Sequence, residues 1–513
     1  MSLMIKMLGR LGKAAVDTAK ETADPDRLLQ VAMRGLIETA RLRHESDPMP
    51  KWAPGEPLRL LLAGYVGTRN TGADVRTEEM IRQFRHLFGD EHCELSICTI
   101  DPELTRGYFR TVKQLHIPQV FHKFLFDTVR EQHGVIACEG SMFKSKFANA
   151  LSTMMAGALG LACAEQKIAV GYGGEAGHMD PSLERFVREA CKDAFVITRN
   201  VESAGVLDRL GLRTEVGTDT AWTFEAAPRE TADKLLRRAG WDGKAPVLAV
   251  CPIHPFWWPV KPDPVRAALA GLSGSFPESH YKSIYFHNDA PEVERKLGTY
   301  IRSLAGAIKD FTAGHGAANH KIFTVLVGME QLDRKACELL SEELGGDVPL
   351  FVSNEHRMYE MVAILRRASL IVSSRYHALV CSMPALVPSV GVTMDERIRN
   401  LMHDRGQPEL LFTVDQEGLD EGLAAAMQRA WSEREAVQDG IGRSVVRNLE
   451  RMGTMGAHLV DYVRGMHPEF PFAQGLGSGG DPWAHLPSLG PTTRALVERY
   501  AGAPSDLQGS LHA

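Results

Sequence analysis

The stretch LRLLLAGYVGTRNTGAD, residues 58–74, indicates the fold of this protein. It joins an apolar run of strand character, 58–65, through a glycine-rich turn to a helical pattern that ends near residue 88. Further strand-length apolar runs alternate with helical patterns up to about residue 211. Such alternation is typical of a parallel sheet covered by helices on both faces, so the sequence predicts an α/β fold.

A second alternating block follows a linker around residues 225–244. Its predicted strands include APVLAVCPI at 245–253, YKSIYFH at 281–287 and ASLIVSS at 368–374, with helical patterns between them. Two successive α/β blocks of similar size predict two domains that face a cleft. Ligands of open α/β sheets bind beyond the carboxyl ends of the strands, so we look for chemistry in the loops that follow the strands.

We therefore divide the chain into four parts. These are an N-terminal helical extension and linker (1–57), a first α/β domain (58–228), a second α/β domain (244–465) and a Gly/Pro-rich tail with a short helix (466–513). The extension contains a predicted helix that starts with Asp24 as N-cap and Pro25 in the first turn. Its apolar stripe comprises Leu29, Met33, Leu36 and Ala40.

The chain has 513 residues, of which 44% are hydrophobic and 24% charged, which is ordinary globular usage. Its formal net charge of −6 does not favour a nucleic-acid partner. The 8 cysteines lie within apolar runs without a CxxC pair, so we expect reduced thiols in a cytoplasmic protein. No apolar run is long enough to cross a bilayer. Residues 1–20 are interpreted as a packing helix, with a peripheral helix at the inner face of the membrane as the alternative.

The turn of the opening stretch is the first candidate for ligand binding. Gly67 and Gly72 permit tight turning and close backbone approach, and the following helix presents free N–H groups to an anion. Asn70 and Asp74 are the polar candidates in the same turn. The alternative is a structural strand-to-helix turn with Asn70 in a left-handed conformation.

Two further candidates follow strands of the first block. Arg199 comes directly after the strand pattern AFVIT and precedes a helix, where it would make a phosphate or carboxylate clamp. The alternative is a solvated surface arginine. Asp219 follows a short strand and is interpreted as an N-cap or turn residue, with a site-orienting acid as the alternative.

The most specific pattern is Ser374-Arg375-Tyr376-His377 after the strand ASLIV. It places a permanent cation and a titratable acid two positions apart at a strand-to-helix junction, which favours an anion beside a proton donor. The alternative for His377 is a helix-start histidine bonded to backbone.

Weaker candidates come from other loops. The pair Trp257-Trp258 would stack on a sugar ring, or pack against the other domain. The remaining candidates are His254 and His287 beside it, Lys144 as an added positive charge in the cleft, and Glu175 and His178 in a strand-end loop. No HExxH, GxSxG or comparable motif is present in a convincing context, and no metal site is predicted.

The order of these motifs resembles the polysaccharide pyruvyl transferase family over about residues 58–402. The motifs are GYVGTRNTGAD, TRN followed by Ser203, Asp219-Thr-Ala, SSRYHALV, VPSVGV and MDERIRNLM. The resemblance implies a glycosyltransferase-B-like fold of two Rossmann-like domains facing a cleft. It also implies phosphoenolpyruvate as co-substrate without a further cofactor, and a glycan acceptor of a cell-surface or exopolysaccharide precursor. The products would be a pyruvate ketal and phosphate.

By this resemblance the Arg-x-His motif of the family falls on Arg375 and His377, and the arginine of an upstream motif falls on Arg199. We expect His377 to protonate the donor and both arginines to bind its phosphate and carboxylate. The sequence departs from the family at Asn200, where an acidic residue is usual, and at 139–141, where a longer glycine-rich run is usual. Two alternatives are a nucleotide-sugar glycosyltransferase on the same fold and a non-catalytic sugar- or anion-binding relative.

Overall fold

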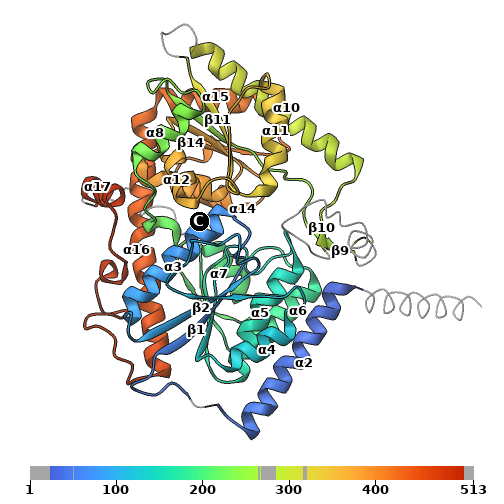
Figure 1. Cartoon of the computed structure of the whole chain (residues 1–513), viewed down its shortest axis with the longest axis vertical. Helices are drawn as coiled ribbons and strands as arrows, with labels where there is room; N and C mark the ends of the chain where they lie inside the picture. The colour runs from blue at the N-terminus through green and yellow to red at the C-terminus, as the bar shows by residue number, and fades with distance from the viewer. Residues whose placement is uncertain (1–23, 50, 264–265, 267–284, 316–320, 502–513) are drawn as a thin grey trace, which may run out of the picture.

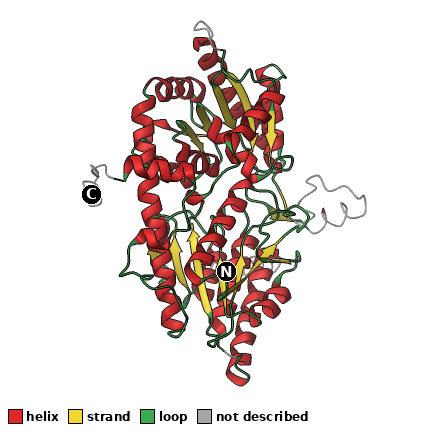
Figure 2. Ribbon diagram, turned by 60° about the vertical axis from the view of Figure 1, so that its left-hand side comes forward, coloured by secondary structure: helices red, strands yellow, loops and turns green. Residues whose placement is uncertain are grey.

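The computed structural model describes residues 24–49, 51–263, 266, 285–315 and 321–501. The predicted N-terminal helix at 1–20 lies outside the described residues. Two α/β domains lie one above the other along the long axis of the molecule, and one long helix, α16 (Arg434–Met466), runs beside both (Figure 1). Figure 2 shows the strands of both domains enclosed between helices.

The first domain is built on a 7-stranded parallel sheet in the order β3-β2-β1-β4-β5-β6-β7. The order reverses between β1 and β4, as in doubly wound Rossmann-type sheets. Its strands are β1 (Leu58–Ala63), β2 (Cys93–Thr99), β3 (Lys113–His116), β4 (Gly134–Ala137), β5 (Ile168–Gly174), β6 (Phe195–Thr198) and β7 (Arg213–Val216). The buried strands are apolar on both faces because helices cover both faces.

The helices of the first domain follow the predicted alternation closely. They are α2 (Pro25–Ser46), α3 (Thr71–Phe88), α4 (His122–Arg130), α5 (Asn149–Ala164), α6 (Pro181–Ala190), α7 (Val201–Asp208) and the short η1 (Ala221–Thr223). Asp24 caps α2 as predicted, because its carboxylate accepts the N–H of Asp26 at 3.0 Å.

The helix α2 packs against α5 through glycines. A side chain at Gly157 would lie 2.6 Å from Met33, and one at Gly160 would lie 2.6 Å from Ile37, so the two helices approach closely. Met33 and Ala40 of the predicted stripe are buried, whereas the next buried position is Ile37 rather than Leu36. The buried face is therefore turned slightly from the predicted one.

The second domain is built on a 6-stranded parallel sheet in the order β12-β11-β8-β13-β14-β15. Its strands are β8 (Val247–Cys251), β11 (Phe323–Gly328), β12 (Leu350–Val352), β13 (Leu370–Ser373), β14 (Ser389–Thr393) and β15 (Leu411–Thr413). Its helices and turns include α10 (Pro291–His315), η2 (Gln331–Asp333), α11 (Arg334–Leu344), α12 (Met358–Arg367), α13 (Tyr376–Ser382), η3 (Met383–Ala385), α14 (Glu396–Asp404), η4 (Pro408–Leu410) and α15 (Leu419–Ser432). The predicted fold class of two Rossmann-like α/β domains is confirmed.

Two predictions for the second block are wrong. The predicted linker around residues 225–244 contains a helix, α8 (Arg229–Arg238), which packs against α12. Within the predicted strand at 281–287 the described part, β10 (Tyr285–Phe286), is not in the main sheet. It pairs instead with β9 (Lys261–Pro262) as a small antiparallel ladder, because the chain leaves the domain core after β8.

Toward its C-terminal end the chain contacts both domains. The second half of α16 lies against β7 and α3, and η5 (Pro482–His485) packs against α16 and α3. The last helix, α17 (Pro491–Tyr500), lies against η3 of the second domain and against α16. The carboxyl ends of the two sheets meet, so the loops after β1, β6 and β7 face those after β11 and β13. Among the described helices none is both long and apolar enough to cross a membrane.

Candidate active site

The turn after β1 is held by its own side chains. Gly67 has a φ of 95°, and a side chain there would lie 2.7 Å from the backbone nitrogen of Asp101. Asn70 is the N-cap of α3, and its Oδ1 accepts the N–H groups of Gly72 and Ala73, each at 3.1 Å. The structural interpretation of this turn therefore fits, because these N–H groups are already satisfied. Asn70 has a φ of −74°, so the predicted left-handed conformation is wrong for it and falls instead on Arg69, whose φ is 57°.

This turn is also docked on the second domain. The backbone N–H of Thr71 donates to the carbonyl of Met329 at 2.8 Å. Glu330 accepts from the amide of Asn70 at 3.0 Å and from the hydroxyl of Tyr65 at 3.0 Å. The two domains are thus joined directly at the turn after β1, which the sequence pattern predicts as a ligand-binding turn.

Asp74, the last candidate of the turn, lies in the first turn of α3 and is fully buried. Its Oδ1 has no hydrogen-bond partner. Burial raises the pKa of Asp74 to about 8, against the attraction of Arg69, so the carboxyl group is protonated at neutral pH.

Arg375 lies among carboxylates of the second domain. Its guanidinium donates to Asp333 at 2.9 Å and to Glu330 at 3.1 Å. Burial lowers the pKa of Arg375, but these two carboxylates raise it well above its ordinary value. Burial also raises the pKa of Asp333 to about 6, despite the opposing attraction of Arg375.

His377 lies on α13 and points to a different carboxylate. Its Nε2 lies 3.2 Å from Oδ2 of Asp219, which follows β7 in the first domain. Residues two positions apart at a helix start do not share a face, so Arg375 and His377 are brought to different carboxylates rather than together. The predicted Arg–His pair is therefore divided between Glu330 with Asp333 on one side and Asp219 on the other.

Asp219 joins three basic side chains. Arg199 donates to its Oδ2 at 3.0 Å, and Arg76 of α3 forms an ion pair with the same atom at 3.0 Å. Its Oδ1 accepts the N–H of Ala221 at 2.9 Å, so the residue also holds the turn that leads to η1. Burial raises the pKa of Asp219, but Arg76 and His377 lower it far below its usual range.

These charges determine the state of His377. Burial lowers the pKa of His377, and the attraction of Asp219 opposes this only in part. The imidazole is therefore neutral at pH 7, and its Nε2 carries the hydrogen that is donated to the ionised Asp219. The other nitrogen, Nδ1, faces the start of α3, because a side chain at Gly72 would lie 2.2 Å from it.

The network continues through Arg199 to a third carboxylate. The guanidinium of Arg199 also donates to Glu175, and it lies 4.5 Å from the ring centre of Tyr376. Lys144 is buried between Glu175 at 3.4 Å and Glu396 of α14 at 2.8 Å. Burial raises the pKa of Glu175, but Arg199 and Lys144 hold it below its ordinary value. The chain of charges thus runs from His377 in the second domain through the first domain and back to α14.

The sequence indicates two members of this network, Lys144 and Glu175, only weakly, and it does not indicate Arg76 at all. The sequence predicts Lys144 and Glu175 in loops, and in the structure both are buried partners of the network. Arg76 lies inside a helical pattern, where an arginine is normally solvated, yet its side chain is fully buried. It also donates to the carbonyl of Gly173 at 2.8 Å, which no periodicity could indicate.

The remaining candidates lie apart from Asp219. Ser374 shares a hydrogen bond of 2.7 Å with the hydroxyl of Tyr300, inside the second domain. The ring of Trp257 stacks on His254 at 4.2 Å and on His287 at 4.1 Å. Two rings cannot share one face at these distances, so both faces of Trp257 are covered and neither is open to a sugar.

Trp258 packs against Phe147 of the first domain, with ring centres 5.1 Å apart. Together with the stack on Trp257, this contact agrees with the packing interpretation of the two tryptophans. Burial lowers the pKa of the neighbouring His254 to about 4, so its ring is neutral within the stack. Among the described residues no group of three or more His, Cys, Asp or Glu side chains is arranged to hold a metal ion.

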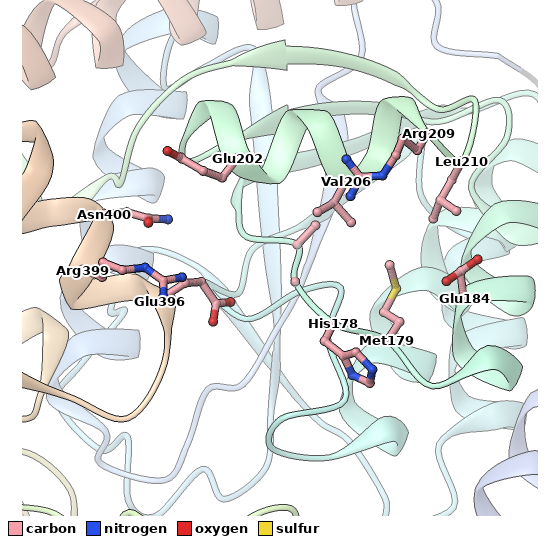
Figure 3. A pocket seen from close by; sticks show the side chains of 12 residues that line it. His178, Met179, Glu184, Glu202, Val206, Arg209, Leu210, Glu396, Arg399 and Asn400 are labelled. Atoms are coloured by element: carbon pink, nitrogen blue, oxygen red, sulfur yellow. The ribbon is translucent and has the colours of Figure 1, made fainter. Parts of the chain in front are cut away.

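A cavity of about 660 Å³ opens between the domains near Glu396. Its walls come from the loop after β5, from α6 and α7, and from α14 (Figure 3). No predicted binding residue from the turn after β1 or from the SSRYH motif lines it. The lining residues are Ala176, Gly177, His178, Met179, Glu184, Glu202, Val206, Arg209, Leu210, Glu396, Arg399 and Asn400.

One family model matches part of the chain. Residues 168–396 match the family model described as polysaccharide pyruvyl transferase. No curated protein matches the chain. The resemblance inferred from the motifs is thus confirmed over this segment, which contains Arg199, Asp219, Arg375 and His377.

Solved structures with a similar arrangement include three that were determined with nucleotides or nucleotide sugars. The HepE protein of Anabaena in complex with UDP and glucose has 10% identity and a TM-score of 0.48, covering 81% of this chain and 100% of its own. MnaA of S. aureus with UDP has 8% identity and a TM-score of 0.49, covering 81% and 99%. The UDP-GlcNAc 2-epimerase of Neisseria meningitidis has 10% identity and a TM-score of 0.46, covering 77% and 99%.

Proposed function

We propose that this protein, which carries a polysaccharide pyruvyl transferase domain over residues 168–396, transfers the pyruvyl group of phosphoenolpyruvate to a glycan. The acceptor is a pair of sugar hydroxyls on a cell-surface or exopolysaccharide precursor. The products are a cyclic ketal and phosphate. We place the reaction in the cytoplasm, where the chain's unpaired thiols stay reduced. The observation that carries the proposal is the convergence of His377 and Arg199 on Asp219 within that domain.

The chemistry requires a proton donor beside an anion site. Protonation of the methylene carbon of phosphoenolpyruvate turns it into a methyl group and leaves positive charge on the neighbouring carbon. One sugar hydroxyl adds to that carbon, the bond between that carbon and the phosphate oxygen breaks, and a second hydroxyl adds to close the ketal. Of the two hydroxyl protons released, one replaces the proton that the enzyme gave to the methyl group, and the other leaves on phosphate.

His377 is the proton donor in this proposal. It is neutral without substrate, because burial lowers its pKa. A bound polyanion favours the charged imidazolium and so raises the pKa of His377. Binding of phosphoenolpyruvate would therefore protonate His377, which then supplies the proton that the reaction consumes. Asp219 keeps the imidazole ring oriented.

Arg199 and Arg375 are the proposed ligands of the phosphate and carboxylate groups. Both are already paired with acids, so the donor must compete with Glu175 at one and with Asp333 at the other. Asp333 can release Arg375 to the donor, because its pKa of about 6 lets the carboxylate take up a proton when a second anion approaches Arg375. A planar guanidinium then binds the incoming oxygens in bidentate fashion.

The test of the donor is a thermal-shift comparison of phosphoenolpyruvate, UDP-glucose and UDP on the full chain. A ligand at 100 times its dissociation constant stabilises the folded state by about 2.7 kcal/mol. We expect stabilisation by phosphoenolpyruvate. Stabilisation by the nucleotide compounds alone would contradict the proposal and favour a glycosyltransferase.

The test of the mechanism is His377→Ala, assayed by phosphate release from phosphoenolpyruvate with glycan acceptors. A positioned general acid contributes about 100- to 10,000-fold, so we expect a loss of that size with the fold retained. His403→Ala is the matched control, since His403 is an exposed histidine of α14. Equal phosphate release by His377→Ala and the wild type would rule out the assigned role.

A further inference from the structure

The cavity of about 660 Å³ lies beside the charge network and is not used in the mechanism above. It lies within the range of about 300–1,000 Å³ that is typical of small-molecule sites. Figure 3 shows α7 along one side, α14 at one end and the loop after β5 along the other side. Both domains therefore contribute to its wall.

The polar lining suits a neutral ligand with many hydroxyls better than an anion. Three glutamates and two arginines line the cavity, so carboxylate acceptors and guanidinium donors are both available. Glu396 is already paired with Lys144 at 2.8 Å. Val206, Leu210 and Met179 add apolar surface for the C–H faces of a ring. No excess of positive charge is present to hold a phosphate or a nucleotide.

One polar atom in this wall has no partner within the protein. The amide Nδ2 of Asn400 is buried without a hydrogen-bond acceptor. Buried polar groups are almost always paired, so this amide is a donor for a ligand oxygen once the Asn400 side chain turns toward the cavity. Asn400 reaches from α14 toward α7 in Figure 3, across the same space that Val206 faces.

The cavity is connected to the proposed proton donor by direct contacts. Glu396 of its wall pairs with Lys144, and Lys144 pairs with Glu175. Glu175 is also bound to Arg199, which shares Asp219 with His377. Glycine at position 177 permits the first of these contacts, because a side chain there would lie 2.6 Å from Glu396 Oε1.

From these observations we propose that the cavity between α7 and α14 binds a neutral sugar unit of the acceptor. Asn400 and Glu202 bind its hydroxyls, and Val206 packs against its ring. The inference rests on the proposed function for the identity of the reaction, while the binding of a sugar is testable without it.

The experiment measures binding of methyl β-D-glucopyranoside, methyl β-D-galactopyranoside and methyl α-D-mannopyranoside to the full chain by saturation-transfer NMR. Val206→Trp would fill the cavity and is expected to abolish the signal. Asn400→Ala removes one donor and is expected to weaken binding by about three- to ten-fold. Val201→Trp is the matched control on the same helix, because Val201 is 59% exposed and does not line the cavity.

Failure of this inference and failure of the proposed function give different results. Binding of none of the three glycosides to the wild type, or equal binding to Val206→Trp, would overturn the sugar site. Thermal unfolding of the same proteins is measured with and without phosphoenolpyruvate. A cooperative transition without ligand shows that each variant folds, and the shift caused by phosphoenolpyruvate should be equal in all of them. Glycoside binding that depends on Val206, without any effect of phosphoenolpyruvate, would support the sugar site and reject the donor.

Discussion

At the residue scale, Asp219 shows how one carboxylate takes on two roles. Its Oδ1 holds a local turn by accepting the N–H of Ala221, as expected for an aspartate after a strand. Its Oδ2 meets Arg76, Arg199 and His377, which come from three distant parts of the chain. The first role is local and can be predicted from sequence, whereas the second depends on the packing of the two domains.

Asp74 yields a prediction for the pH dependence of stability. Its pKa is about 8 when folded and near 4 when unfolded, so between these values the folded state holds one proton more than the unfolded state. Stability contributed by this group therefore falls as pH rises, by about 1.4 kcal/mol per pH unit in the middle of the window. Asp74→Asn stays neutral and should remove this slope between pH 5 and pH 8 in denaturant unfolding. Asp242→Asn, at an exposed aspartate, is the control, and an unchanged slope in Asp74→Asn would show that Asp74 is ionised when folded.

At the element scale, the start of α3 positions His377, the proposed proton donor. The helix is capped by Asn70, bound to the second domain at Thr71, and packed against the ring of His377 at Gly72. The glycine is required for the contact with the ring and not for the turn itself. The glycine-rich loop, a typical anion cradle in sequence, is here an interface between domains.

Gly72→Ala tests this positioning. The new methyl group would lie 2.2 Å from Nδ1 of His377, so the ring must leave its present position against Asp219 and Gly72. We expect about 100-fold slower phosphate release, since a displacement of about 1 Å can cost that much. The NMR signals of the His377 ring should shift as well.

The control for this substitution is Gly35→Ala in α2, where a side chain meets nothing within 4 Å. It should leave activity unchanged and stabilise the protein by about 0.5–1 kcal/mol, because alanine favours a helix over glycine. If Gly72→Ala kept both wild-type activity and the wild-type histidine signals, α3 would not position His377.

At the scale of the whole molecule, α16 couples the two domains. Asn448 of this helix lies between them, because it accepts from Thr218 of the first domain at 2.5 Å and donates to Asp404 of the second at 3.0 Å. Farther along the helix, Gln83 of α3 donates to the carbonyl of Met452 at 3.0 Å. One hydrophobic core includes residues of both sheets and of α16.

We therefore expect a single calorimetric unfolding transition, with equal calorimetric and van't Hoff enthalpies. Asn448→Ala should lower the free energy of unfolding by about 1–3 kcal/mol without splitting the transition, because it leaves buried partners unpaired. Glu450→Ala, at an exposed position of the same helix, should have little effect. Two resolved transitions in the wild type would show that the domains unfold independently.

The two α/β domains follow from the sequence alone, since strand and helix patterns are local and both sheets are buried on both faces. The sequence also predicts that Arg199 and His377 lie at strand ends, because that position follows from chain order. The stretch 225–244 is predicted as a linker because the pattern of α8 is short and strongly polar, whereas its packing against α12 makes it a helix of the second domain.

Which charged side chains pair with one another depends on the tertiary structure. Arg375 and His377 are two residues apart, yet one is bound by Asp333 and the other by Asp219, because their side chains leave the helix start in different directions. Arg76 has no distinguishing pattern, and it joins the network because α3 packs against η1, which directly follows the turn at Asp219. Ion pairing of this kind depends on distances across two domains, and those are set by packing rather than by the order of residues along the chain.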